Sequence, residues 1–279
     1  MDNTGRSQER QAELARQQLP RDIAELVGQV SEAPSGPSRS RRLSAEISRL
    51  AGRSGRAGWR GARSGGRWLT NEVLAMAPRL PVRDQQRLRA QFPGMGPEEL
   101  ADALIHGAGR SAAVVGAAAG AAMVLPLPTA PVEIAVETLA LVGIEIKLVA
   151  ELHEVYGVRA PGSRPERMMA YVSAWAHRRG VALAPAGLVL VAGSPLRRRL
   201  QRRLIARAGR SAISLGPLLT GSIAGAALNR RETLHLGSDV RKDIRRRVPY
   251  AARWDGWQGW QGWQGGGGRA RRDLKGGGD

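Results

Sequence analysis

Cysteine is absent from the 279 residues, which excludes disulfides, thiolate zinc sites, iron–sulfur clusters and cysteine nucleophiles. Aromatic residues are scarce, with one Phe, three Tyr and seven Trp, and only three of the 43 basic residues are Lys. No phosphate loop, dinucleotide-binding fingerprint or GxSxG nucleophile elbow occurs. The sequence therefore predicts a protein without a cofactor, a metal ion or an enzymatic activity.

Positive charge is concentrated in one segment of a chain whose formal net charge is +19. Residues 158–252 contain 19 basic and 4 acidic side chains, whereas residues 106–157 contain 2 and 5. A GC-rich genome also encodes many arginines, but composition bias alone would spread them more evenly. A concentrated positive field attracts nucleic acid or anionic lipid head groups.

Composition divides the chain into three predicted regions. Residues 1–95 are polar and basic, with short helices such as 19–30 and an RG-rich segment at 52–67 that resembles either a flexible linker or an RNA-binding segment. Residues 96–250 are predicted to form a helical domain. Residues 251–279 form a GWQ-repeat tail that is too Gly-rich to fold alone. Its tryptophans suit an interfacial anchor or a base-stacking platform: Trp254, Trp257, Trp260 and Trp263.

Helical signals dominate the middle of the chain. Pro97 suits a first helical residue and is followed by two acidic residues, which favours a helix start there. Further helices are expected at 129–156, ending at Gly157, and at 165–179. No β-branched alternation extends over six residues, so no strand is expected. The predicted fold class is an all-α helical bundle with a flexible N-terminal region.

Small residues recur at helical spacing in two segments. They predict a close approach of helices, within the chain or between the copies of a homo-oligomer. The predicted packing residues are Ala112, Gly116 and Gly120 in the first segment, and Gly221 and Gly225 in the second.

Charged residues of the 129–156 helix fall on one arc of about 100°: Glu133, Glu137, Lys147, Glu151 and Glu154. This arc predicts a solvated face or an internal partner for arginine. A sharper hypothesis docks it against the arginines of residues 197–210. The ELHE motif does not favour a metal site, because His153 lies on a different helical face from the two glutamates.

Three uncharged runs bear on membrane insertion: residues 111–132, 180–196 and 211–228. Prolines shorten the first helix to about 16 residues, or about 24 Å, against a hydrocarbon core of about 30 Å. The runs are also rich in Ala and Gly. A peripheral bundle, a re-entrant hairpin and spanning helices all remain open interpretations.

Residues 197–210 contain seven arginines and no acid: Arg197, Arg198, Arg199, Arg202, Arg203, Arg207 and Arg210. This segment suits an anionic membrane surface, nucleic-acid phosphates, or a plain solvated helix. Lipid is favoured because no aromatic residue interleaves with the arginines. A last basic helix is predicted at 238–247.

The order of four segments resembles EcsC-like proteins, a bacterial family linked by name to ABC-transporter operons. These segments are GAAAGAAMVLPLPTAP, KLVAELHEVYG, RMMAYVSAWA and LGPLLTGSIAGAALNRRET, within residues 97–247. The resemblance implies an all-helical, membrane-associated or cytoplasmic protein of unknown activity, with membrane or transporter proteins as partners. It implies no functional residues.

The combined expectation is a non-enzymatic protein on the cytoplasmic side of the cell membrane, attached through basic amphipathic helices. The first residues, MDNTGRSQERQAEL, contain no apolar stretch of the kind that a cleaved secretory signal needs. The alternative is a nucleic-acid-binding protein that uses the arginine-rich helix, the RG-rich segment and the tail.

Overall fold

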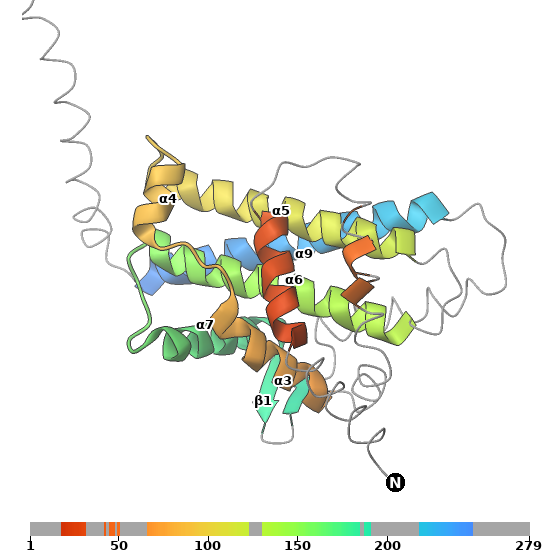
Figure 1. Ribbon diagram of the computed structural model, residues 1–279. Helices are drawn as coiled ribbons and strands as arrows, with labels where there is room; N and C mark the ends of the chain where they lie inside the picture. The colour runs from red at the N-terminus through yellow and green to blue at the C-terminus, as the bar shows by residue number, and fades with distance from the viewer. Residues whose placement is uncertain are drawn as a thin grey trace, which may run out of the picture.

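The computed structural model describes residues 18–31, 42, 45–47, 49–50, 66–122, 130–184, 187–190 and 218–247. The described part is an all-α helical bundle, as predicted, with one small hairpin at its edge (Figure 1). The arginine-rich segment 197–210 and the tail 251–279 lie outside the described residues.

Helix α6 (Ala130–Val155) is the central element of the bundle. Every residue from Val136 to Leu152 is buried, so no side of this stretch faces solvent. A helix that is apolar on nearly all sides is stable only when other helices surround it. Its predicted bounds, 129–156, agree with the structure to one residue, and Gly157 follows in the left-handed conformation (φ 68°) that ends a helix.

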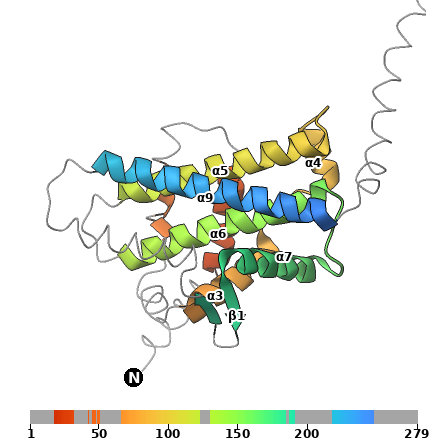
Figure 2. The ribbon, with the colours of Figure 1, turned by 180° about the vertical axis from the view of Figure 1, so that it is seen from behind.

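Helices α5 (Pro97–Ala122) and α9 (Leu218–Arg247) form the most extensive helix–helix contact. They lie side by side in Figures 1 and 2 and run antiparallel. Gly116 of α5 contacts Gly225 of α9, and further along the two helices Ile105 of α5 contacts Gly237 of α9. Asp102 then binds Arg241, with 2.5 Å between Oδ1 and Nη1. The predicted close packing of small residues therefore occurs within one chain at Gly116 and Gly225.

The N-terminal elements pack on the other side of α6. They comprise a helix over residues 18–31, α3 (Gly66–Met76), the 3-10 helix η1 (Ala77–Arg79) and α4 (Gln85–Gln91). A Cβ on Gly143 of α6 would lie 2.7 Å from a methyl group of Val27 and 3.4 Å from Leu80 and Met76. One hydrophobic core thus includes residues from both sides of the predicted boundary at residue 95.

Helix α7 (Arg164–Arg179) begins at a capping box and ends at Gly180, whose φ is 62°. The Glu166 carboxylate accepts hydrogen bonds from the Ser163 backbone N and Oγ at 2.6 and 2.7 Å. Strands β1 (Val181–Ala184) and β2 (Gly187–Leu190) follow as an antiparallel hairpin. The expectation of no strand is wrong at this point, because two apolar runs separated by two residues can pair without β-branched alternation.

Helix α9 is longer than the sequence predicts. The 211–228 run and the 238–247 helix were predicted as separate segments, but residues 218–247 form the single helix α9. No break occurs because residues 229–237 lack proline and continue the helical pattern.

Among the helices of the described residues, none combines the length and the apolar character that a membrane span requires.

Candidate binding site around helix α6

The charged residues of α6 are buried rather than solvated, which corrects one of the two interpretations of the charged arc. Glu137, Lys147, Glu151 and Glu154 are each at most 7% exposed. The side chain of Glu133 is not described. A buried charge is costly unless it is paired and hydrogen-bonded. The other interpretation, an internal partner for arginine, is confirmed at Glu151, which binds Arg83, and at Glu154, which binds Arg159 at 2.7 Å.

Arg83 binds Glu151 from the loop between η1 and α4. Its Nε and Nη2 donate to the two carboxylate oxygens at 2.8 and 2.7 Å, and its backbone N donates at 3.2 Å. The third guanidinium nitrogen donates to Gln91 Oε1 at 2.7 Å. Lys147, one turn before Glu151, donates to the same carboxylate. The partner of Glu151 is therefore Arg83; the arginines at 197–210, which the sharper hypothesis named, lie outside the described residues.

Burial alone raises the pKa of Glu151, but the Arg83 hydrogen bond and the charges of Lys147 and Arg83 outweigh it. The net effect lowers the pKa of this carboxyl below its ordinary value. Glu151 is therefore an anion that holds two cations in place.

A second buried cluster centres on Glu145 of α6. Arg179 of α7 donates to both carboxylate oxygens, from Nε at 3.0 Å and from Nη2. Trp175 Nε1 donates at 2.8 Å, and Thr233 Oγ1 of α9 lies 3.3 Å away. Arg179 also binds Glu232 of α9 at 3.1 Å. This cluster joins three helices of the core, α6, α7 and α9.

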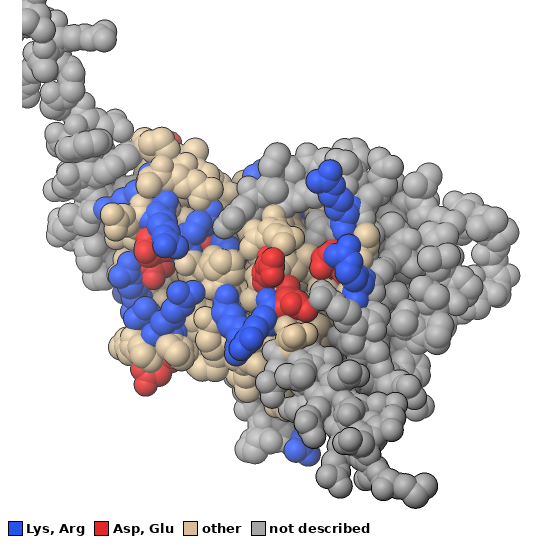
Figure 3. All heavy atoms as spheres, in the orientation of Figure 1, with Lys and Arg blue, Asp and Glu red and all other residues tan. Residues whose placement is uncertain are grey.

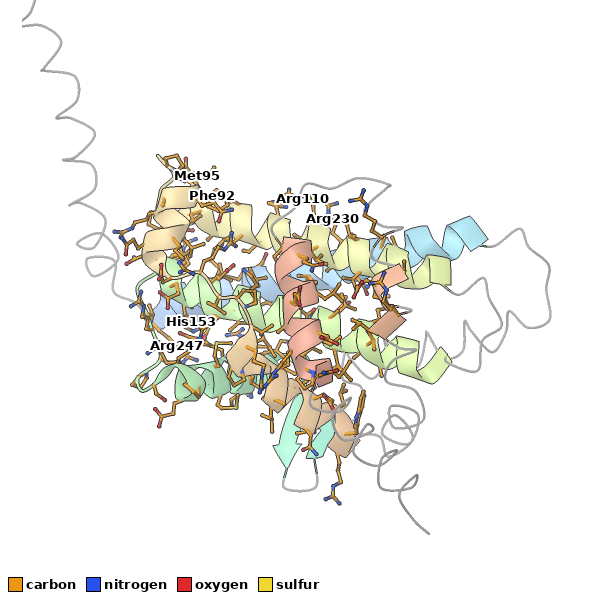
Figure 4. All side chains as sticks on the ribbon, viewed as in Figure 1. Phe92, Met95, Arg110, His153, Arg230 and Arg247 are labelled. Carbon is orange, nitrogen blue, oxygen red and sulfur yellow. The ribbon has the colours of Figure 1, made fainter. Side chains whose placement is uncertain are left out.

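The Glu151 cluster borders a cavity of about 290 Å³ between α4, α5 and α6. Its polar lining includes Arg83, His106, Arg110, Lys147 and Glu151. Its apolar lining includes Phe92, Leu104, Ile144 and Leu148. Figure 4 shows Phe92 at the end of α4 and Arg110 further along α5. The combination of a charged floor with apolar walls is typical of sites for small molecules.

Helix α9, which lies in front in Figure 2, carries a concentration of basic residues. Between residues 225 and 247, every exposed charged side chain of this helix is basic or histidine. We call the six exposed cations the basic face: Arg230, Arg231, Lys242, Arg245, Arg246 and Arg247. The acidic residues of this stretch, Glu232, Asp239 and Asp243, are only partly exposed.

Part of the basic face is neutralised. Arg247 lies 3.0 Å from Asp243, Arg245 lies 3.5 Å from Glu98 of α5, and Lys242 lies 3.9 Å from Asp239. Arg230, Arg231 and Arg246 have no ion pair with any residue that the structure describes. On the side of the molecule that Figure 3 shows, acidic side chains lie among the basic ones.

The predicted site residues fall into two groups. Ala112 is fully buried, Gly116 and Gly225 meet at the α5–α9 contact, and Gly120 and Gly221 lie within these two helices. The predicted lipid or nucleic-acid ligands lie outside the described residues, as do the tail tryptophans: Arg197, Arg198, Arg199, Arg202, Arg203, Arg207, Arg210, Trp254, Trp257, Trp260 and Trp263.

Arg83, Phe92 and Arg110 line the cavity but belong to no sequence motif. In a chain with 43 basic residues, single arginines give no local signal of a site. No group of three His, Cys, Asp or Glu side chains in the described ranges could hold a metal ion. No family model, curated protein or solved structure matches this chain.

Proposed function

We propose that this protein is a non-enzymatic protein that binds the anionic cytoplasmic surface of the cell membrane peripherally, through the basic face of α9. The observation that carries the proposal is the excess of positive charge on α9, which has seven Lys and Arg side chains and three Asp and Glu side chains. Arg231, Lys242 and Arg246 fall within about 60° of one another around the helix. Arg231 and Arg246 are 15 positions apart, which corresponds to about 22 Å along a helix. A row of that length can contact a flat layer of head groups at several points.

The charges support weak, salt-sensitive attachment. Each Lys or Arg near an anionic bilayer contributes about 1 kcal/mol. The three arginines without an ion pair therefore contribute about 3 kcal/mol, or roughly a hundredfold in affinity. Stable anchoring usually needs a second signal. The arginines at 197–210 and the tryptophans of the tail are the candidates for that second signal.

The EcsC-like resemblance of residues 97–247 rests on helix order and agrees with a membrane-associated role. Nucleic acid is the alternative partner, because phosphates respond to the same field. The described part of α9 offers no Phe, Tyr or Trp on which bases could stack. Lipid is therefore the preferred partner.

The test is co-sedimentation of the full chain with phosphatidylcholine vesicles, with and without phosphatidylglycerol. Binding should require phosphatidylglycerol and weaken as salt is raised, because added salt shortens the Debye length. The triple variant R230Q/R231Q/R246Q should lose roughly a hundredfold in affinity. The matched control is R21Q/R67Q/R87Q, which removes three exposed arginines from other elements and should bind like the wild type.

An oligonucleotide arm separates the two partners. Binding of labelled single-stranded or duplex DNA or RNA without vesicle binding would replace the lipid proposal with the alternative. Equal loss in both triple variants would show that net charge alone matters and would refute the assignment to α9. Absence of binding to vesicles and to oligonucleotides would refute both.

A further inference from the structure

The cavity between α4, α5 and α6 is built from segments that are distant in the sequence. It includes Ser31 at the end of the first helix, Phe92 after α4, and residues 103–111 of α5. Small residues of α5, among them Ala103, Gly107 and Ala108, line it and leave it open. Its volume of about 290 Å³ lies just below the range of about 300–1,000 Å³ for small-molecule sites, so it suits a small ligand.

The floor of the cavity is rigid and charged. Lys147 and Glu151 are 2% and 3% exposed, and Arg83 is held by Glu151 and Gln91. The Arg83 guanidinium also lies 6.0 Å from the centroid of the Phe92 ring, within cation–π range. Side chains held in this way need little reorganisation when a ligand binds.

The mouth of the cavity adds a further cation. Arg110 lines the cavity, is exposed, and has no ion pair with a described residue. The described lining therefore contains three cations (Arg83, Arg110 and Lys147) and one carboxylate, Glu151. This excess of positive charge in a partly enclosed, low-dielectric space favours an anion over a neutral or cationic ligand.

We propose that this cavity binds a small organic anion that carries one carboxylate or phosphate group on an apolar body. Arg110 binds the charged group at the mouth, since its planar guanidinium matches both oxyanions. The apolar body lies against Phe92, Leu104 and Ile144. This ligand is a free small molecule, and the inference is independent of the membrane proposal because Arg110 is not part of the basic face.

Gly107 offers a sharp test, because it lines the cavity and has free space around it. A Cβ at this position would meet only the tip of the Arg110 side chain, at 3.9 Å. The variant G107L should therefore fill the cavity without a backbone clash, and leucine is also the better helix former. Its melting temperature should equal or exceed that of the wild type.

The experiment is calorimetric titration of the full chain with benzoate and with phenyl phosphate, and with benzamide and benzamidine as neutral and cationic counterparts. We expect at least one anion to bind while the counterparts do not. G107L should abolish the binding, and R110Q should weaken it about tenfold through loss of a charge-assisted hydrogen bond. R67Q, which removes an exposed arginine of α3 outside the cavity, should bind like the wild type.

Three results would overturn the proposal: no binding of either anion by the wild type, binding of benzamidine as tight as that of the anions, or anion binding that G107L and R110Q leave unchanged. R110Q keeps the test valid even if G107L fails to fold, since Arg110 is exposed and has no ion pair with a described residue. Vesicle binding by G107L should match that of the wild type, which separates the two proposals.

Discussion

Arg179 of α7 and Glu145 of α6 form a two-point ion pair inside the core, with Nε 3.0 Å from Oε2 and Nη2 on Oε1. Both side chains are almost fully buried, Arg179 at 6% and Glu145 at 2% exposed. Burial lowers the pKa of Arg179, but the charges and hydrogen bonds of Glu145 and Glu232 raise it by more. The net pKa is raised, so the guanidinium stays protonated. The pair therefore fixes how α7 and α9 sit on α6.

Replacing Arg179 with Met should lower the free energy of unfolding by about 3–5 kcal/mol, because Glu145 would remain buried without its cation. The double variant E145Q/R179M should recover part of the loss, since no buried charge is then left. Urea denaturation measures both. R178M is the matched control: Arg178 is partly exposed on Asp243 at 2.8 Å and should contribute at most about 1 kcal/mol. Equal losses in R178M and R179M would contradict the assignment.

Local signals account for what the sequence predicted correctly. Pro97 and Gly157 place helix ends within one or two residues, because each acts through its own backbone conformation. Gly116 and Gly225 were singled out by spacing alone, and the structure brings them together.

Non-local contacts account for what the sequence missed. Glu151 meets Arg83 across 68 positions and Glu145 meets Arg179 across 34. Periodicity shows that the α6 charges share an arc, but it cannot show whether that arc faces water or an arginine from another segment. The hairpin at Val181–Leu190 does have a local signal, two apolar runs separated by two residues, but each run is too short to show a strand-like alternation.

Acid should weaken the protein through Glu151. Because its pKa in the folded state is lowered, the unfolded chain binds this proton more readily. The stabilisation is complete above the unfolded pKa of about 4.3 and declines as the pH falls through the folded pKa. The free-energy difference between the wild type and E151Q, measured by denaturation across pH 7 to 3, should therefore shrink toward acid. A free-energy difference that stays constant across this pH range would contradict the prediction. The control is E25Q, which removes an exposed glutamate.

His153 should produce a second pH dependence, at higher pH. Burial lowers its pKa, the Val149 carbonyl 2.7 Å from Nδ1 raises it, and Arg247 lowers it again, with a net decrease. Figure 4 shows His153 and Arg247 at the same end of the bundle. The unfolded chain takes up this proton near pH 6.5, so stability falls as the pH drops from there toward the folded pKa.

The variant H153Q lacks this titrating ring. The difference in stability between H153Q and the wild type should therefore change between pH 7 and pH 5. Thermal denaturation at closely spaced pH values measures the change. H177Q removes an exposed histidine of α7 and should keep the wild-type profile. Parallel profiles for the wild type and H153Q would show that the buried ring does not govern stability in this range.

Two glycines of α5 should respond in opposite directions to the same substitution. A Cβ on Gly116 would lie 2.8 Å from the carbonyl oxygen of Gly225 and still closer to the Asn229 amide, whereas a Cβ on Gly107 meets nothing nearer than 3.9 Å. G116A should therefore lower the free energy of unfolding by about 1–3 kcal/mol, because α5 and α9 must move apart. G107A should raise it by about 0.5–1 kcal/mol through helix propensity alone. Urea denaturation of both variants measures this contrast, and each is the control for the other because helix and substitution are shared. A gain in both would mean that α5 and α9 do not approach each other as closely as the structure has them.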